Sequence, residues 1–538
     1  MLLMLGSITG CGDDDDCCDQ NEDEAEAAGT PDAYIASATP QVVVVSGTNY
    51  EMGVQYGRQA APAIYHNIII FKSKLYTGLG SETVNEDMDV WDSYLVQYDP
   101  TLGDWLDGIS QGCADMGYEV SYSELIMLMV YPTELWSRPS DYPPEWGTGS
   151  QAAEVTSQAE ATDAPPYHSC NSFAANGVAT SDGNPMHAIT QMAGTEMMDN
   201  IILLAFPDEG YSFVSQTYAG RVNANSAMNS NGFSWTMTAI LSDAPVWGLS
   251  EVYFHYLAQI TGSTVEAIEY LQNTPRGGVA GGFVLSDANG IDVFETHDDV
   301  YSQRTPSDSG FVVQTNHLVD PELSAYNPTW LNFIGTYERY DTVFQFLTEA
   351  AAGAVNFEFA KSVFSSSDWY DAETGTWNEN DPGSGFISND HTSVSQSVFF
   401  PADLIAYLQT GTPSGNGIPA NATGEYVKIK LATDPKTVTV QADEDALANY
   451  WEAADLFEHE LNDAPDYLTT DVIADVQGKL DEAMTAYSYG IDRAAYADLE
   501  TDETESIMLW GSALTHFAKA QLYAQMARTT LREAQPAP

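Results

Sequence analysis

The spacing of hydrophobic positions changes twice along the chain and separates a helical part, a strand-rich part and a second helical part. A β-branched run at 41–46 predicts a buried strand, and residues 50–74, 104–116 and 121–136 carry apolar positions at helical spacing. From residue 169 onward, short apolar segments alternate with Gly, Asn and Pro, which is typical of strands. The strands predicted in this part are 173–178, 186–190, 201–206, 212–216, 233–240, 282–285, 291–295, 401–410 and 426–440, with helices at 250–260, 264–272 and 339–351.

Two further segments differ in composition from these parts. Residues 137–166 are rich in Ser, Pro, Gly, Ala, Thr and Glu with almost no aliphatic side chains, which predicts a long loop or linker. From residue 443 the chain is rich in Ala, Leu and Glu and predicts three helices, at 443–461, 470–487 and 504–534. No internal repeat is visible.

The charge balance excludes two classes of partner. Of 538 residues, 17 are Lys or Arg and 78 are Asp or Glu, which gives a formal net charge of −61. Such a surface repels nucleic acid and anionic membranes. Because the acidic residues are scattered rather than grouped, we interpret them as a hydrating surface for a salty environment. Hydrophobic residues make up 44%, enough for a sizeable packed core.

The first residues resemble a bacterial lipoprotein signal. A short apolar run at 1–10 is followed by Cys11, where such a signal ends and the cysteine receives lipid, although the usual positive start is missing. An acidic, small-residue stretch then predicts a solvated tether to about Asp32. We therefore expect an exported protein, lipid-anchored at Cys11 to a bacterial envelope membrane. No other segment reaches eighteen apolar residues, so we expect membrane contact only through this anchor.

Cysteine and histidine spacing indicates neither a disulfide framework nor a metal site. The five cysteines are Cys11, Cys17, Cys18, Cys113 and Cys170. Only Cys113 and Cys170 lie in the globular part, and their pairing with each other stays open. His297 and His459 have acidic neighbours but lack zinc-ligand spacing. With no phosphate-binding loop or dinucleotide fingerprint either, we predict no metal and no cofactor.

One serine lies in a nucleophile-like motif. Residues 108–112 read G-I-S-Q-G and match the G-x-S-x-G elbow with Ser110 at its centre. That elbow needs a strand immediately before the serine. The preceding residues 104–107 favour a helix, so a serine hydrolase using Ser110 is a minor alternative.

Cys170 is the stronger candidate, because it stands after the predicted linker and at the start of the strand-rich part. Its thiol could attack the Ser169 carbonyl, and hydrolysis of the resulting ester on sulfur would leave Cys170 as a new N-terminus. The freed α-amine, with an ordinary pKa near 8, could then serve as base for its own thiol. From the residues alone, a buried structural cysteine at a strand start is the better interpretation.

Several segments, in order, resemble the acyl-coenzyme A:6-aminopenicillanic acid acyltransferase family of N-terminal-nucleophile (Ntn) hydrolases. They are G-T-N-Y-E-M-G-V-Q-Y-G at 47–57, C-N-S-F at 170–173, A-T-S-D-G at 179–183, A-G at 219–220 with M-N-S-N-G-F at 228–233, D-A-N-G at 287–290, T-N-H at 315–317 and Arg339 three residues after Thr336. The resemblance covers about 46–431.

The resemblance implies a four-layer αββα fold, cleavage between Ser169 and Cys170, and Cys170 as nucleophile. It implies that the Asn229 side-chain amide helps form the oxyanion hole, and that Asn316 and Arg339 support the site or bind substrate. In one respect the chain departs from the family. An aspartate that assists the nucleophile's amine is absent at 184–192, and Glu196 or Asp199 could replace it.

We therefore predict an α+β protein of αββα type in four parts: a signal and tether at 1–40, an N-terminal part at 41–169 ending in a linker at 137–169, the Ntn core at 170–440 and a helical extension at 441–538. The predicted activity is amide hydrolysis through an acyl-enzyme on Cys170. The substrate would be a small molecule, namely an N-acyl, peptide-like or lactam-like amide, and the two cleaved chains would stay associated. The alternatives are acyl transfer to an amine and a non-catalytic surface lipoprotein that binds through the same fold.

Overall fold

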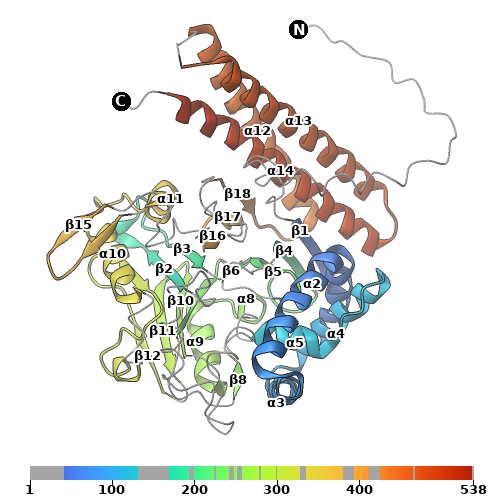
Figure 1. Ribbon diagram of the computed structural model, residues 1–538, viewed down its shortest axis with the longest axis vertical. Coiled ribbons are helices and arrows are strands. Elements are labelled where there is room, and N and C mark those ends of the chain that lie inside the picture. Colours follow the sequence, from blue (N-terminus) through green and yellow to red (C-terminus); the bar gives the residue numbers. More distant parts are fainter. Residues whose placement is uncertain are drawn as a thin grey trace. The chain divides into compact units, whose positions relative to one another are not determined.

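Two β-sheets packed face to face form the centre of the computed structural model (Figure 1). The structure describes residues 41–130, 169–192, 199–222, 226–240, 248–250, 257–277, 280–297, 300–327, 335–366, 368–379, 393–410, 425–463 and 467–535. Met1–Ala38 and the predicted linker at 137–166 lie outside these residues, so the tether, Cys11 and the linker stay predictions.

The first sheet has eight strands, and β1 alone pairs in parallel. Its strands, in spatial order, are β1 (Gln41–Gly47), β4 (Asn200–Pro207), β5 (Phe213–Tyr218), β6 (Ser226–Asn229), β7 (Ser234–Ile240), β10 (Ala280–Asp287), β11 (Gly290–His297) and β12 (Val300–Arg304). The hairpin predicted at Asn289-Gly290 joins β10 to β11, which are paired from Gly281 with Thr296 to Asp287 with Gly290.

The second sheet has six strands and carries Cys170. In spatial order they are β13 (Phe311–Gln314), β2 (Ser169–Ala175), β3 (Met186–Met192), β16 (Ser393–Phe400), β17 (Ile405–Thr410) and β18 (Val427–Lys430). Two short pairs complete the described strands, β8 (Leu249–Ser250) with β9 (Arg276–Gly277) and β14 (Trp369–Asp371) with β15 (Thr376–Asn378).

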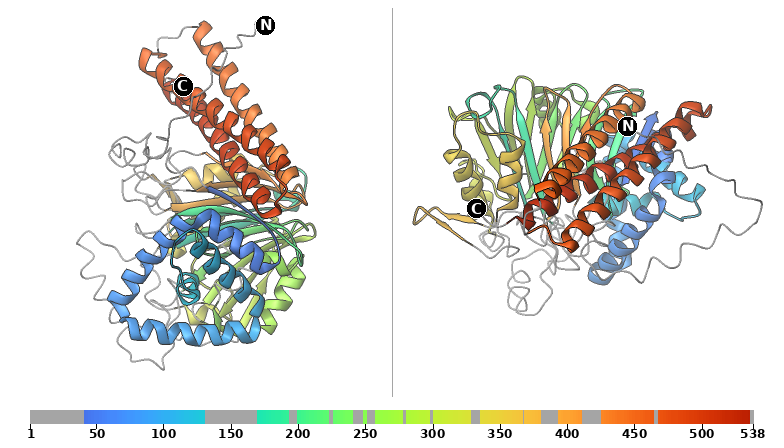
Figure 2. Two further views of the ribbon diagram at one scale, coloured as in Figure 1. Left: turned by 90° about the vertical axis from the view of Figure 1, so that its right-hand side faces the viewer. Right: turned by 90° about the horizontal axis from the view of Figure 1, so that it is seen from above.

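Helices cover the outer face of each sheet and make the four layers αββα (Figure 2). The first sheet is covered by α2 (Asn49–Leu79), α3 (Ser81–Tyr98), α4 (Pro100–Asp115), α5 (Tyr122–Val130), α8 (Leu257–Ile260) and α9 (Thr264–Asn273). The second is covered by α10 (Thr336–Glu349) and α11 (Phe357–Ser365), and beside them stand α12 (Pro435–Asp463), α13 (Thr470–Leu499) and α14 (Glu503–Ala534). None of the described helices is long and apolar enough to cross a membrane.

The G-x-S-x-G segment is helical, which argues against Ser110 as a nucleophile. Ser110 lies inside α4 and donates a hydrogen bond to the Val120 carbonyl 2.6 Å away. The flanking Gly108 and Gly112 instead let α4 touch α2 backbone to backbone, since a Cβ on Gly112 would lie 2.2 Å from the Val54 carbonyl oxygen. The glycines are required for helix packing, and the elbow geometry of a strand before the serine is absent here.

Some predicted elements differ from the structure. Residues 435–440, predicted as strand, are the first turns of α12, because Asp434 caps them by accepting a hydrogen bond from the Thr437 N–H at 2.9 Å. Pro435 at the first helical position favours the same start. The helix α3 between residues 81 and 98 was not predicted. Its many acidic residues make the helical spacing of the buried Val84, Trp91 and Leu95 hard to recognise in the sequence.

The helix α14 covers one edge of each sheet, at β1 and at β18, and is therefore part of the fold rather than an appendage. At β1, the Thr515 hydroxyl lies 2.9 Å from the Val42 backbone nitrogen. At β18, Gln521 accepts from the Lys428 N–H, and Gln525 donates to the Tyr426 carbonyl. Edge strands otherwise offer unpaired N–H and C=O groups to other chains, so these side chains protect against aggregation.

We expect the double substitution Gln521→Met, Gln525→Met to lower the apparent melting temperature and increase aggregation on heating, because the β18 edge loses its partners. The matched control is Gln477→Met on the exposed face of α13, where the amide bonds only with Asp481. Differential scanning fluorimetry with light scattering measures both effects. Equal behaviour of the two variants would contradict the edge-covering role of α14.

Candidate functional site

Cys170 lies at the start of β2 with its side chain directed between the two sheets. Alternate residues of a strand face the same side. Two positions on, the Ser172 hydroxyl lies 2.6 Å from the Thr236 hydroxyl of the opposite sheet, which fixes the direction of the Cys170 side chain as well. Cys170 is 1% exposed, and across the β2–β3 ladder it pairs with Gln191.

Two buried polar side chains that are distant from Cys170 in the sequence form hydrogen bonds with its backbone. The Asn316 side-chain oxygen Oδ1 accepts a hydrogen bond from the Cys170 N–H at 2.8 Å. The Arg339 guanidinium donates from Nη1 to the Cys170 carbonyl oxygen at 2.9 Å and also to Asn171 Oδ1. Its Nη2 donates to Asn316 Oδ1 at 2.9 Å, so Asn316 and Arg339 form one unit around the Cys170 peptide groups.

The position of Asn316 is set by its neighbours. Its backbone N–H donates to the Thr336 hydroxyl at 2.9 Å, and its side-chain amide donates to the Ala239 carbonyl at 2.7 Å. The turn that follows is held by Glu295, whose carboxylate is fully buried and accepts from the backbone N–H groups of Val319 and Asp320 at 2.8 and 2.7 Å. Asn316 thus has little freedom to rotate.

Neither histidine near this unit is charged at neutral pH. Burial lowers the pKa of His317 to about 3, and the positive charges of Arg339 and Arg304 add to the shift. Burial likewise lowers the pKa of His187 to about 3. His187 lies between the sheets, with its ring nitrogens 2.9 Å from the Thr236 hydroxyl and 3.2 Å from the Ser234 hydroxyl. Neither His187 nor His317 can therefore act as a general base at neutral pH.

A second buried arginine, Arg221, lies in the turn after β5 of the first sheet, beside Tyr218. Burial raises the pKa of the Tyr218 phenol; Arg221 opposes that shift, and the charge of a Cys170 thiolate adds to it. The guanidinium carbon of Arg221 lies 5.1 Å from the centre of the Tyr218 ring. Tyr218 therefore remains a protonated phenol within electrostatic range of Cys170.

A family model described as acyl-coenzyme A:6-aminopenicillanic acid acyl-transferase matches residues 193–364 of the chain. The resemblance to this family is confirmed over these residues. They include Asn316, Thr336 and Arg339 and begin after Cys170, so the side chains that hold the Cys170 backbone belong to the matched stretch and Cys170 itself does not.

The other similarities are more distant. An uncharacterized protein of Archaeoglobus fulgidus is 25% identical over 229 residues, which are 39% of this chain and 35% of that protein. The chain thus spans about a third of the length of this curated relative.

Three solved structures are similar at a TM-score of 0.30. They are an N-acylethanolamine-hydrolyzing acid amidase ortholog of Caenorhabditis elegans (14% identity, 43% of this chain, 93% of that one), penicillin V acylase of Agrobacterium tumefaciens (16%, 49% and 92%) and a mutant conjugated bile acid hydrolase of Clostridium perfringens (10%, 49% and 97%). Because such a score is too low to establish a common fold, the αββα assignment rests on the sheet order and layers described above.

Of the residues predicted from the family resemblance, the structure brings Cys170, Asn316 and Arg339 together and places Ser169 beside them at the start of β2. It does not bring Asn229 to them. Both amide hydrogens of Asn229 are committed, to the carbonyls of Ala258 at 2.9 Å and Thr261 at 2.7 Å. These hydrogen bonds of the Asn229 side chain therefore hold α8 against the β6–β7 turn.

The distance also excludes Asn229 as the oxyanion donor. Asn229 precedes β7, whereas Asn316 contacts Ala239 near the other end of that strand. Five residues of extended strand separate Ser234 from Ala239, about 17 Å. The assignment of Asn229 to the oxyanion hole was therefore wrong.

Asp199 does not fill the place of the missing aspartate. Asp199 faces α2, where its carboxylate lies 2.9 Å from the His66 ring and its backbone N–H bonds with Asn67. Glu196 lies outside the described residues. The disulfide left open between the two core cysteines is not formed, because neither Cys113 on α4 nor Cys170 on β2 is part of a disulfide. Burial raises the pKa of the Cys113 thiol to about 12.

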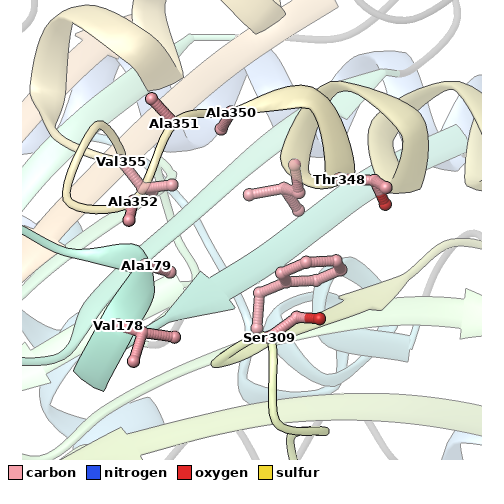
Figure 3. A pocket seen from close by; sticks show the side chains of 10 residues that line it. Val178, Ala179, Ser309, Thr348, Ala350, Ala351, Ala352 and Val355 are labelled. Atoms are coloured by element: carbon pink, nitrogen blue, oxygen red, sulfur yellow. The ribbon is translucent and has the colours of Figure 1, made fainter.

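A small apolar cavity of about 210 Å³ lies beside the loop after α10, away from Cys170 (Figure 3). Val178, Phe311 and Leu347 are among its lining residues. From Cys170 to Ala175, the last residue of β2 before this region, the strand covers about 17 Å. The cavity therefore does not serve the Cys170 site.

Among the described residues, no group of three or more His, Cys, Asp or Glu side chains could hold a metal ion.

The neutral His187 makes the inter-sheet layer sensitive to acid. Its folded pKa of about 3 lies below the ordinary 6.5, so the unfolded chain binds a proton that the folded chain does not. Stability is therefore lost as the pH falls from 6.5 towards 3, and at pH 5 the loss amounts to about 2 kcal/mol. We expect His187→Gln to weaken the dependence of the urea midpoint on pH between 7.5 and 5, while His459→Gln on exposed α12 does not. An unchanged pH dependence in His187→Gln would show that His187 is charged in the folded protein.

Proposed function

We propose that this chain is a self-processing amide hydrolase that uses Cys170 as an N-terminal nucleophile. The observation that carries the proposal is the convergence of Asn316 and Arg339 on the backbone of Cys170, from 146 and 169 residues away in the sequence. Both are in the family-matched stretch, and they meet on the peptide groups of Cys170.

The first reaction would act on the chain itself. The Cys170 sulfur attacks the Ser169 carbonyl carbon, a C–S bond forms, the Ser169–Cys170 C–N bond breaks, and the amine leaves with the thiol proton. Water then hydrolyses the thioester to the Ser169 carboxylate and the free thiol. Asn316 Oδ1, which accepts from the Cys170 amide N–H in the intact chain, is placed to accept from the α-amine afterwards.

The second reaction would repeat these steps on an amide substrate. The α-amine of Cys170 accepts the thiol proton, because His187 and His317 are too weakly basic at neutral pH. Sulfur adds to the substrate carbonyl, the C–N bond breaks as the amine departs with a proton, and water releases the acid from the thioester. If an amine replaced water in the last step, the same site would perform acyl transfer.

Cleavage would not release the N-terminal part. The strand β1 is paired with β4 along its seven residues, from Gln41 with Ile201 to Gly47 with Pro207. Its other edge is held by α2, where Gln55 bonds with both the N–H and the carbonyl of Ser46. We therefore expect two chains that copurify, tethered through Cys11 if that cysteine is lipidated.

We expect the intact mass of purified wild-type protein to show two fragments that divide between Ser169 and Cys170. Cys170→Ala, which removes the attacking sulfur, should give one uncut chain. Cys113→Ala is the matched control, since its thiol is buried on α4, and it should be cut like the wild type. Turnover of penicillin V or an N-acylethanolamine by the wild type but not by Cys170→Ala would then identify an amide hydrolase.

One uncut chain in both wild type and Cys170→Ala would contradict the proposal. It would favour the alternative of a binding lipoprotein, which the absence of the family aspartate at 184–192 supports.

Arg339→Lys should slow self-cleavage at least about tenfold, because an ammonium cannot donate in one plane to the Cys170 carbonyl, Asn171 and Asn316 together. The fraction of cut chain against time after synthesis, measured by mass, gives the rate. Arg493→Lys on the exposed face of α13 is the control. If Arg339→Lys is cut at the wild-type rate, the guanidinium does not organise the scissile peptide.

A further inference from the structure

Gln191 is the residue directly opposite Cys170 in the β2–β3 ladder. Directly opposed residues of antiparallel strands place their side chains on the same face of the sheet, with Cβ atoms about 4.5–5.5 Å apart. The side chain of Gln191 therefore starts beside that of Cys170, in the layer between the two sheets, and its carboxamide extends towards Ser395 of β16. Gln191 belongs to the segment in which the family aspartate is missing, and no role has been assigned to it so far.

The carboxamide of Gln191 is buried and only half satisfied. The residue is 5% exposed. Its Oε1 accepts a hydrogen bond from the Ser395 hydroxyl of β16 at 2.9 Å, and its Nε2 has no hydrogen-bond partner among the described residues. A buried N–H group without an acceptor costs about 1–3 kcal/mol, and folded proteins keep few of them. An acceptor that arrives beside Cys170 would satisfy this N–H group.

We propose that Gln191 Nε2 is a donor of the oxyanion hole. This inference rests on the proposed function. When the Cys170 sulfur forms a bond to an acyl carbon, the π electron pair of the carbonyl moves to its oxygen, while the thiol proton passes to the α-amine. The resulting oxyanion needs a donor next to the sulfur, and Gln191 Nε2 supplies one. It takes the role that Asn229, with both amide hydrogens committed elsewhere, does not perform.

Ser395 makes this donor rigid. Its hydroxyl fixes Gln191 Oε1 from the next strand, since Ser395 pairs with Gln191 in the β16–β3 ladder. A donor that is already oriented costs little reorganisation when the oxyanion forms, which is the condition for strong stabilisation.

The chain offers a matched control in Gln396. This glutamine is 1% exposed on β16, its Oε1 accepts from the Tyr426 hydroxyl, and its Nε2 also has no partner among the described residues. It differs from Gln191 in direction. Gln396 adjoins Ser395 along β16, so it points to the outer face of the second sheet, away from the Cys170 side chain.

Two thiol reagents separate an oxyanion donor from a residue that merely shapes the site. Acylation of Cys170 by p-nitrophenyl acetate passes through an oxyanion, whereas alkylation by iodoacetamide displaces iodide and forms none. We expect Gln191→Met to slow acylation about a hundredfold and to leave alkylation unchanged. Gln396→Met should change neither. Release of p-nitrophenolate and peptide mass mapping of Cys170 give the two rates, on samples whose cleaved fraction is known from intact mass.

Each result decides the question. Equal acylation rates in wild type and Gln191→Met would overturn the role of Gln191 while the proposed function stands. A wild-type Cys170 that is alkylated but never acylated would overturn both. A Gln191→Met chain that folds but stays uncut, beside a cut Gln396→Met chain, would support the role, because the Ser169 carbonyl is the first group that Cys170 attacks. If Gln191→Met does not fold, Gln191→Glu keeps the acceptor for Ser395, removes the donor, and should show the same loss of acylation.

Discussion

The site depends on a single oxygen atom, Oδ1 of Asn316. It accepts from the Cys170 N–H at 2.8 Å and from the Arg339 guanidinium at 2.9 Å, and so joins the start of β2, the segment after β13 and the helix α10. Further bonds join the same elements, since Arg339 also donates to the Cys170 carbonyl and the Asn316 N–H donates to the Thr336 hydroxyl. A buried carbonyl oxygen with two donors is favoured in a low-dielectric interior, and removing it leaves both donors without this acceptor.

The layer between the sheets is unusually polar for a protein core, and this determines how the sheets align. Ser172 and His187 of the second sheet meet Thr236 and Ser234 of the first, and Ser226 meets Ser397 at 3.0 Å. A shift of one residue in either sheet would turn every one of these groups to the opposite face and leave buried donors unpaired. Apolar contacts alone, as among Val42, Val44 and Ile202 at the other side of the layer, tolerate small displacements. The polar contacts thus place Cys170 against the first sheet in a fixed position.

Part of this arrangement could be predicted from the sequence, and part could not. The strand at 41–46, the hairpin at Asn289-Gly290 and the three C-terminal helices follow from local patterns, because hydrophobic spacing and turn chemistry act over a few residues. The meeting of Cys170 with Asn316 and Arg339 came only through the family resemblance, since no local rule joins residues so far apart. Asn229 was assigned wrongly for the same reason. The sequence does not tell whether the side chain of an Asn in a turn bonds nearby backbone or reaches the site, whereas the structure shows both amide hydrogens of Asn229 donated to the carbonyls of Ala258 and Thr261. Gln191 could have been found from the hairpin register, which places it opposite Cys170.

The buried charges near Cys170 are positive, whereas the net charge of the whole chain is negative. The surface is strongly acidic, with a formal net charge of −61, yet basic residues such as Arg221 and Arg339 are buried. Inside the protein these charges act in a low dielectric, whereas the surface carboxylates are screened by salt within about 10 Å. Under the proposed function, these buried charges would favour an oxyanion formed at Cys170 even though the protein as a whole repels anions. The neutral state of His187 follows from burial, and that of His317 from burial together with the positive charges of Arg339 and Arg304. In the proposed mechanism, the α-amine of a cleaved Cys170 is therefore the group that takes up the thiol proton.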